Sequence, residues 1–188
     1  RSEIAQHLLS FEPELFFQPE EELASAHTSR LGRWFPSLIT GERLVGLNSA
    51  TQVFELTRKM TLFRPELRIL TVFPSPEAFA RFAREVLKSA SLEPWERSIR
   101  LLDPADRELL QQLHAQVRAL PLAVWMQWRA AAMLTANRVG WLFACHWEEV
   151  SHTLGGDALD PVKQDLLRYT VSGRFTAALT SLGAIPSS

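Results

Sequence analysis

Apolar residues recur at helical spacing through most of this chain of 188 residues. The clearest arc predicts a helix over 49–63 and consists of Val53, Leu56, Met60 and Phe63. Asn48 or Ser49 is a favourable N-cap for it, because a side-chain oxygen there accepts a hydrogen bond from a first-turn N–H group. Pro65 predicts its end, since proline biases the preceding residue away from helical backbone angles.

Other helices are predicted to begin at a polar residue followed by proline, which fits the first helical position. The starts and the expected helices are Ser75-Pro76 for 75–89, Asp103-Pro104 for 103–118 and Asp160-Pro161 for 160–182. We expect a kink in the last of these at Ser172-Gly173. The long apolar stretch after Pro121 predicts a further helix, which continues through Trp147–Leu154 directly or after a bend.

Strand-like patterns are short and lie near the N-terminus. Leu15–Phe17 is an apolar run ended by a proline, and Ser37–Gly41 predicts a strand leading into a turn. Residues 67–73 alternate in part and predict a strand or extended segment. Residues 3–9 have the pattern of a helix end, and residues 20–35 are polar and irregular, with at most one helical turn. The sequence therefore predicts a mainly α (α+β) fold, a helical bundle with a few short strands near the N-terminus.

The apolar stretch Leu122–Trp147 is long enough to span a bilayer. It carries four polar or charged residues, namely Gln127, Arg129, Asn137 and Arg138. Each central arginine costs about 2.5–3.5 kcal/mol on insertion scales. We therefore expect no membrane insertion and interpret the stretch as a buried central helix of a soluble domain.

Composition limits the classes of function. The chain has 20 basic and 21 acidic side chains, a net charge of −1, which gives no general attraction to nucleic acid. Cys145 is the only cysteine, so no internal disulfide can form, and we expect a small core residue in a reducing, cytoplasmic compartment. The chain begins at Arg1 rather than Met, which suggests a fragment. We expect a connecting segment over 1–35, as the end of a helical repeat region, and a domain over 36–188.

The histidines do not form a metal-binding pattern. They are His7, His27, His114, His146 and His152, and none has a second histidine four residues later. Cys145, Glu148 and Glu149 lie close to His146 and His152, but adjacent residues on a helix point about 100° apart. We expect no chemical role for this cluster, no bound metal and no cofactor.

One run has the place, but not the ligands, of a zinc-peptidase motif. Phe54-Glu55-Leu56-Thr57-Arg58 follows Leu38-Ile39-Thr40-Gly41 and Leu44-Val45, and Met133-Leu134-Thr135-Ala136-Asn137-Arg138 lies downstream. The arrangement resembles the gluzincin metallopeptidases related to the CAAX prenyl endopeptidase and the minigluzincins. In that family the first run is His-Glu-x-x-His, and the second is Glu-x-x-Ala-Asp-Arg, whose Glu is the third zinc ligand.

The resemblance implies a scaffold that has lost its metal. Phe54, Arg58 and Met133 take the three ligand positions, and Asn137 replaces the aspartate. A catalytic zinc requires three protein ligands, and neither a phenyl ring nor a guanidinium can coordinate one. Glu55 keeps the place of the general base, but without a metal it faces ordinary water of pKa about 15.7. We expect the five residues to pack and plug this site, with Asn137 hydrogen-bonding toward the first helix.

The chain is also similar to a domain that follows tetratricopeptide repeats in very large bacterial proteins. The segments that carry this similarity are Phe63-Arg64-Pro65-Glu66, Thr135–Gly140, Asp165–Tyr169 and Leu182-Gly183. The similarity covers roughly residues 36–183 and implies a protein partner or the preceding repeats as the binding target, because a repeat array needs an end cap over its apolar surface.

Several alternatives stay open at this point. Glu55, Arg58 and Lys59 fit a solvated salt-bridge face, or Glu55 and Arg58 form a buried pair in place of the metal. The tryptophans fit a core, or some of them, with Trp34, Trp95 and Trp147 as candidates, line a contact surface.

We expect a non-catalytic protein-interaction or repeat-capping domain. The alternative is a hydrolase with a relocated site at Glu55, His146 and Asp157, or with a metal held by His114, His146 and His152.

Overall fold

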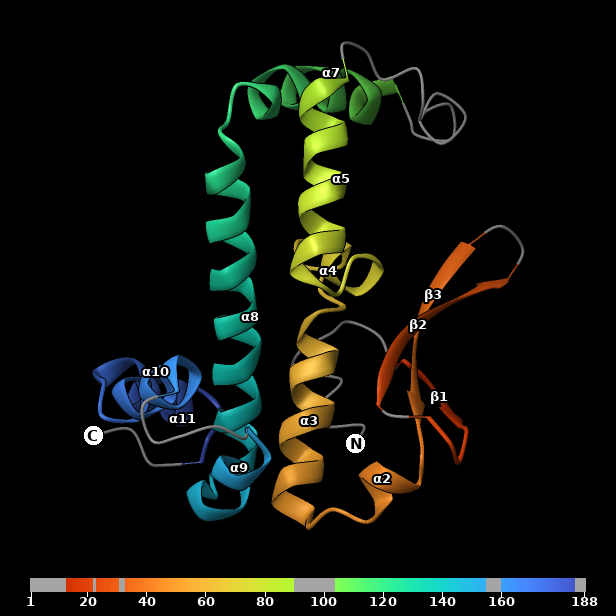
Figure 1. Cartoon of the computed structure of the whole chain (residues 1–188). Coiled ribbons are helices and arrows are strands. Elements are labelled where there is room, and N and C mark those ends of the chain that lie inside the picture. Colours follow the sequence, from red (N-terminus) through yellow and green to blue (C-terminus); the bar gives the residue numbers. More distant parts are fainter. Residues whose placement is uncertain (1–12, 22, 31–32, 90–103, 155–159, 185–188) are drawn as a thin grey trace. The chain divides into compact units, whose positions relative to one another are not determined.

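Helices dominate the computed structural model, which describes residues 13–21, 23–30, 33–89, 104–154 and 160–184. Within these ranges the strands all precede residue 41 and helices make up most of the rest (Figure 1). This confirms the predicted mainly α fold with a few short strands near the N-terminus. The helix end expected at 3–9 lies outside the described residues. The chain divides into two compact units, the first formed by Arg1–Thr71 with Ala132–Ser188 and the second by Val72–Ala131.

The described strands of the first unit form one sheet in the order β1-β3-β2. They are β1 (Glu14–Phe17), β2 (Ala24–Arg30) and β3 (Arg33–Thr40). β1 runs parallel to β3, and β2 runs antiparallel to it. In the register of the sheet, Leu15 of β1 and Ser25 of β2 both pair with Leu38 of β3. The prediction of irregular structure over 20–35 was wrong, because pairing with β3 gives the polar β2 segment its backbone hydrogen bonds. The boundary expected between residues 35 and 36 falls inside β3. The division into a connecting segment over 1–35 and a domain over 36–188 stays a prediction.

The helix predicted at 49–63 is present as α3 (Ser49–Thr61), after the short α2 (Glu42–Val45). Asn48 is its N-cap, as predicted, and its side-chain oxygen accepts a hydrogen bond from the Thr51 N–H at 2.8 Å. One side of α3 meets the sheet in a small core of Leu38, Met60 and Phe63. The apolar arc of the sequence therefore identified the helix correctly.

The segment after α3 is helical rather than extended. Leu67, Arg68 and Leu70 donate backbone hydrogen bonds three or four residues back, and these turns lead into α4 (Ile69–Val72). Leu67 and Leu70 are both buried at helical spacing. The strand predicted over 67–73 was wrong because part of its alternation coincides with this i, i+3 pattern.

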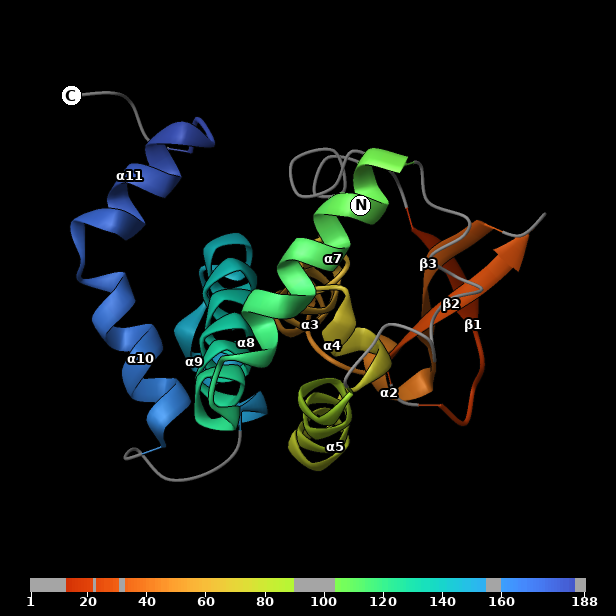
Figure 2. The ribbon, with the colours of Figure 1, turned by 90° about the horizontal axis from the view of Figure 1, so that it is seen from above.

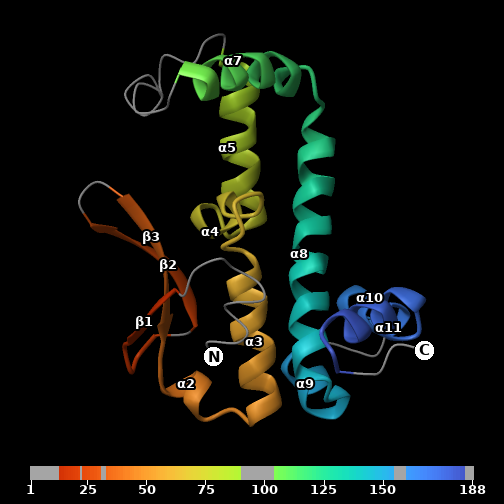
Figure 3. The ribbon, with the colours of Figure 1, turned by 180° about the vertical axis from the view of Figure 1, so that it is seen from behind.

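The long apolar helix is α8 (Leu122–Ala144), and it is buried over only part of its length. All its buried residues lie in the half that belongs to the first unit, beginning at Ala132, whereas Val124 and Trp128 are exposed. The prediction of a buried central helix therefore holds for the second half of α8 and not for the first. Figures 1 and 3 show the second half of α8 beside α3.

The C-terminal helices are α9 (Trp147–Thr153), α10 (Pro161–Thr170) and α11 (Gly173–Ser181). Cys145 has a φ of 49°, and this left-handed residue separates α9 from α8. Asp160 caps α10 through hydrogen bonds from the N–H groups of Val162 and Lys163. At Ser172 the chain breaks into two helices where a kink was expected (Figure 2).

The second unit contains α5 (Pro76–Lys88), α7 (Pro104–Arg118) and the first part of α8. The Ser75-Pro76 and Asp103-Pro104 starts predicted α5 and α7 correctly. The Ser75 side chain caps α5 by accepting a hydrogen bond from the Ala78 N–H. Phe79 is fully buried, and its ring lies 5.8 Å from that of Trp128 and 6.2 Å from that of Trp125. Aromatic packing is thus the main feature of this unit's core.

Candidate functional site

Phe54, at the first ligand position of the resembled motif, is fully buried between α3 and α8. It faces Gly140, where an added Cβ would lie 2.8 Å from the Phe54 carbonyl oxygen and 3.0 Å from its ring. Phe54 also belongs to the core cluster with Trp141, Val150 and Leu166. The two helices meet at this point because residue 140 has no side chain.

Glu55 and Arg58 form an ion pair one turn apart on α3. Arg58 Nη2 lies 2.6 Å from Glu55 Oε2, and their side chains are 25% and 14% exposed, respectively. The guanidinium carbon of Arg58 also lies over the Phe54 ring, 5.8 Å from its centroid. Both alternatives considered for this pair hold in part, since it is an i, i+3 salt bridge and is mostly shielded from solvent.

Met133 and Asn137 come from α8 and lie on the same helical face as Gly140. Met133 is half-buried and two turns from Gly140, about 10 Å along the axis at 1.5 Å per residue. Asn137 is 5% exposed, and its Oδ1 has no hydrogen-bond partner among the described residues. Asn137 Oδ1 therefore does not supply the hydrogen bond expected toward the first helix. Thr57 Oγ1, fully buried on α3, likewise has no partner there.

The two downstream segments that carry the family resemblance meet in space. Arg138 of α8 donates to both carboxylate oxygens of Asp165 on α10, at 2.9 Å from Nε and 2.5 Å from Nη2. This hydrogen bond is the main cause of a raised pKa for Arg138. The same guanidinium lies 5.6 Å from the Tyr169 ring centroid. The contact positions α10 on α8 and is structural.

The described part of the chain forms no metal site like that of the hydrolase alternative, and the relocated site at Glu55, His146 and Asp157 stays a prediction. Within it, no three His, Cys, Asp or Glu side chains are placed to hold a metal ion. His146 faces Glu149, 3.8 Å from Nδ1 to Oε1. Asp157 lies outside the described residues.

A cleft of about 580 Å³ lies in the first unit, within the usual size range of ligand sites. Its floor is a face of α3, and its walls come from Leu23, from α2 with the turn after it, and from α9. The lining residues are Leu23, Arg43, Leu44, Leu47, Asn48, Thr51, Glu55, Arg58, Lys59, Glu149, His152 and Thr153. Two residues of the expected degenerate site, Glu55 and Arg58, line this cleft, whereas Phe54, Met133 and Asn137 do not.

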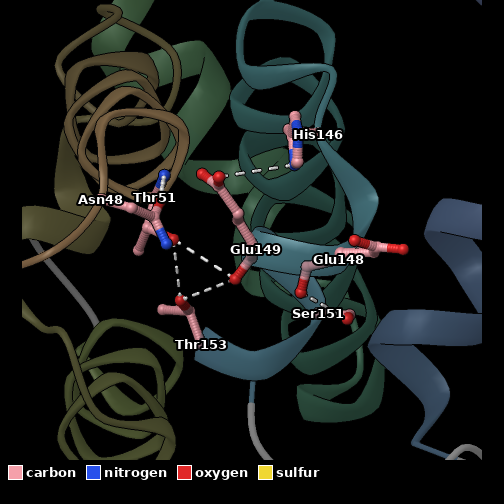
Figure 4. A network of polar contacts seen from close by, with 7 residues as sticks. All are labelled: Asn48, Thr51, His146, Glu148, Glu149, Ser151 and Thr153. Carbon is pink, nitrogen blue, oxygen red and sulfur yellow. Dashed lines mark hydrogen bonds and ion pairs between the residues drawn. The ribbon is translucent and has the colours of Figure 1, made fainter.

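The α9 wall is joined to α3 by hydroxyl groups (Figure 4). Thr51 Oγ1 donates to the Glu149 carbonyl oxygen at 3.3 Å, and Thr153 Oγ1 donates to Thr51 Oγ1 at 3.2 Å. Figure 4 shows the Glu149 carboxylate pointing away from these hydroxyls toward His146. The hydroxyl contacts hold two sides of the cleft in place with uncharged groups.

Lys59 is the cleft residue with the most unusual electrostatics. Burial lowers the pKa of its ammonium group, the Arg58 guanidinium lowers it further, and Glu55 opposes the shift. No ion pair joins Lys59 to a carboxylate among the described residues. The sequence reasoning placed Lys59 on a solvated face and missed the cleft. A usable signal was the helical spacing of Asn48, Thr51, Glu55 and Lys59, all polar, on one side of α3.

Trp147 and Cys145 are not among the residues that line this cleft. Trp147 is half-buried and packs edge-to-face on Trp141, with ring centroids 5.6 Å apart. Trp34 lies in β3, but its side chain, like all of Trp95, falls outside the described residues. Cys145 was expected in the core, and this was wrong: it is exposed in the turn between α8 and α9, although partial burial still raises the pKa of its thiol.

Comparison with the known protein families, with curated proteins and with solved structures finds no match to this chain. The resemblance to gluzincins and to the repeat-associated domain therefore remains a prediction from the quoted residues. Among the described helices none is long and apolar enough to cross a membrane.

Proposed function

We propose that this chain is a non-catalytic domain, on a scaffold similar to a gluzincin without its zinc ligands, that binds a protein partner or caps the preceding helical repeats. It would act in the bacterial cytoplasm without a cofactor. The observation that carries the proposal is the contact between Phe54 and Gly140, in which a buried phenyl ring occupies the first ligand position and closes the space between the two helices.

The Glu55 carboxylate supports the same interpretation. A glutamate that acts as a general base needs a free oxygen directed at a water or substrate proton. Glu55 Oε2 instead accepts a short, charge-assisted hydrogen bond from Arg58 at 2.6 Å. The Arg58 guanidinium, at the second ligand position of the resembled motif, would repel a divalent metal ion.

Exposed apolar residues support protein binding. Leu15 and Phe17 lie on one face of the edge strand β1 and are 41% and 57% exposed, whereas Phe16 on the opposite face is 40% exposed. Two exposed apolar side chains on the same face of an edge strand indicate a contact surface more strongly than scattered ones do. We therefore place a protein contact on the first unit, next to its sheet.

Zinc analysis of the purified protein tests the proposal. We expect far less than one zinc per chain by elemental mass spectrometry, before and after incubation with zinc and desalting. A triple variant, Phe54→His with Arg58→His and Met133→Glu, restores the ligand set of the resembled family and is expected to bind zinc. One zinc per chain in the unmodified protein, lost on Glu55→Gln with Met133→Ala, would overturn the proposal.

A further inference from the structure

The strand β1 lies at an edge of the described sheet, with β3 on one side and no described strand on the other. Along a strand the backbone N–H and C=O groups of successive residues point to alternate sides. The N–H of Gln18, directly after β1, donates to the Thr40 carbonyl oxygen of β3 at 2.9 Å, in the register that pairs Phe17 with Thr40. Leu15 and Phe17 therefore direct their N–H and C=O groups away from β3, toward the open edge.

Prolines on both sides of β1 limit how a second copy of this strand can pair with it. In an antiparallel pair, hydrogen bonds are exchanged between residues whose backbone groups face the neighbouring strand. If Leu15 pairs with Leu15 of the second copy, Phe17 lies opposite Pro13, and if Phe17 pairs with Phe17, Leu15 lies opposite Pro19. A proline has no N–H to donate. The register that pairs Leu15 with Phe17 of the second copy avoids both prolines and gives every outward group a partner.

The side chains of β1 are self-complementary in this register. Phe16 lies opposite Phe16 of the second copy on the two-fold axis, in a pair without backbone hydrogen bonds, where facing side chains approach most closely. Leu15 lies opposite Phe17 on the other face, so that two apolar pairs flank the central one. Glu14 lies opposite Gln18, and no like charges face each other. The exposed fractions of Leu15, Phe16 and Phe17, 41%, 40% and 57%, leave this apolar surface accessible to such a partner.

We propose that β1 binds β1 of a second copy of this chain, antiparallel and centred on Phe16, so that two three-stranded sheets continue as one. This inference rests on the protein contact proposed above and gives that contact a partner. A two-fold axis is the commonest symmetry of homo-oligomers. Because a contact of one four-residue strand per copy is smaller than the roughly 1,200 Å² that stable complexes bury, the dimer is weak and forms at high protein concentration.

The test is sedimentation equilibrium of the chain and its variants, up to roughly millimolar protein. We expect the unmodified chain to dimerise in this range. Phe16→Lys and Phe16→Glu each place like charges opposite each other at the two-fold axis and should weaken the dimer about tenfold. A mixture of the two variants places opposite charges there and should associate about tenfold more tightly than either variant alone. Recovery in the mixture is specific to self-pairing in this register.

The variant Phe17→Pro tests the backbone contacts. It removes an N–H that faces the open edge, and edge strands tolerate proline where the N–H faces solvent. We expect the dimer to be lost while circular dichroism shows an unchanged fold, and Phe17→Ala, which keeps the N–H, to weaken the dimer less. Val171→Lys adds a lysine at an 87% exposed apolar position between α10 and α11 and is the control for Phe16→Lys, with dimerisation expected to be unchanged.

Several results would overturn the proposal. They are a chain that stays monomeric throughout this range, a mixture of Phe16→Lys and Phe16→Glu that associates no better than its components, and a dimer that Val171→Lys weakens as much as Phe16→Lys does. A monomeric chain without bound zinc overturns this inference alone. One zinc per chain overturns the non-catalytic function whatever the state of association, so the two failures are distinguishable.

Discussion

At the scale of single residues, Gly140 sets how closely α3 and α8 approach. A methyl group there would lie 2.8 Å from a backbone oxygen, which cannot move aside as a flexible side chain can. Gly140→Ala gains helix propensity of about 1 kcal/mol but overpacks the contact at a cost of about 1–3 kcal/mol. We expect a net loss of about 1 kcal/mol in the free energy of unfolding, measured by urea denaturation.

Gly173→Ala is the matched control for that substitution. It adds the same methyl group at the start of α11, where nothing lies within 4 Å. We expect it to be neutral or slightly stabilising. Equal effects of the two substitutions would show that the approach of Phe54 to Gly140 is looser than described.

Lys59 gives a prediction for pH. Its pKa is lowered in the folded protein, so above that lowered value and below 10.5 the unfolded chain binds more protons than the folded one. Stability due to Lys59 therefore rises with pH through this window, and below it the folded state carries the full cost of the buried charge. The charged groups around it in the cleft are Arg43, Glu55, Arg58, Glu149 and His152.

The measurement is the difference in unfolding free energy between Lys59→Gln and the unmodified protein. We expect the advantage of the variant to be largest near neutral pH and to shrink as pH approaches 10.5, where folding no longer buries a charge. A difference that stays constant across that range would contradict the assigned burial of the ammonium group. Lys88→Gln, which removes a lysine at an exposed position on α5, is the control.

At the scale of elements, capping decides where α3 begins. Asn48→Ala removes the acceptor of the Thr51 N–H and is expected to destabilise α3 by about 1 kcal/mol. Asn48→Asp keeps an acceptor and adds a negative charge near the helix N-terminus, so it should retain full stability. Amide hydrogen exchange of Thr51 and the next residues measures this directly, and fast exchange in both variants would argue against a cap.

Sequence reasoning predicted the helices correctly but missed the strand β2, whose structure depends on hydrogen bonding to β3. The Ser-Pro and Asp-Pro starts, the Asn48 cap and the arc of Val53, Leu56, Met60 and Phe63 are local signals, and each produced its element. β2 could not be found in this way, because its side chains are polar and its stability comes from β3. The missed α4 shows the converse, since a short apolar alternation is ambiguous until its hydrogen bonds are known.

At the scale of the whole molecule, the chain has two compact units with separate cores. Phe79 belongs to the second, where it is fully buried among Phe82, Trp125 and Trp128. Phe79→Ala is expected to cost that unit about 3–5 kcal/mol through the cavity it leaves. Hydrogen exchange should accelerate strongly in α5 and the first half of α8, and much less in α10.

That comparison also tests the division into units. Leu166→Ala, in the core of the first unit with Phe54 and Val150, should show the reverse pattern, with protection lost in α10 rather than α5. If both variants lowered protection equally in both units, the chain would unfold as one cooperative body.

By itself the sequence determined the mainly helical class, most helix boundaries and the substitutions at the expected zinc-ligand positions, because helical periodicity, caps and side-chain chemistry are properties of neighbouring residues. Tertiary structure alone decided that Phe54 packs against Gly140 while Glu55 and Arg58 turn to a cleft beside Lys59. Residues 98 apart, such as Thr51 and Glu149, meet there. No local pattern encodes that contact, since it depends on how α9 folds back after Cys145.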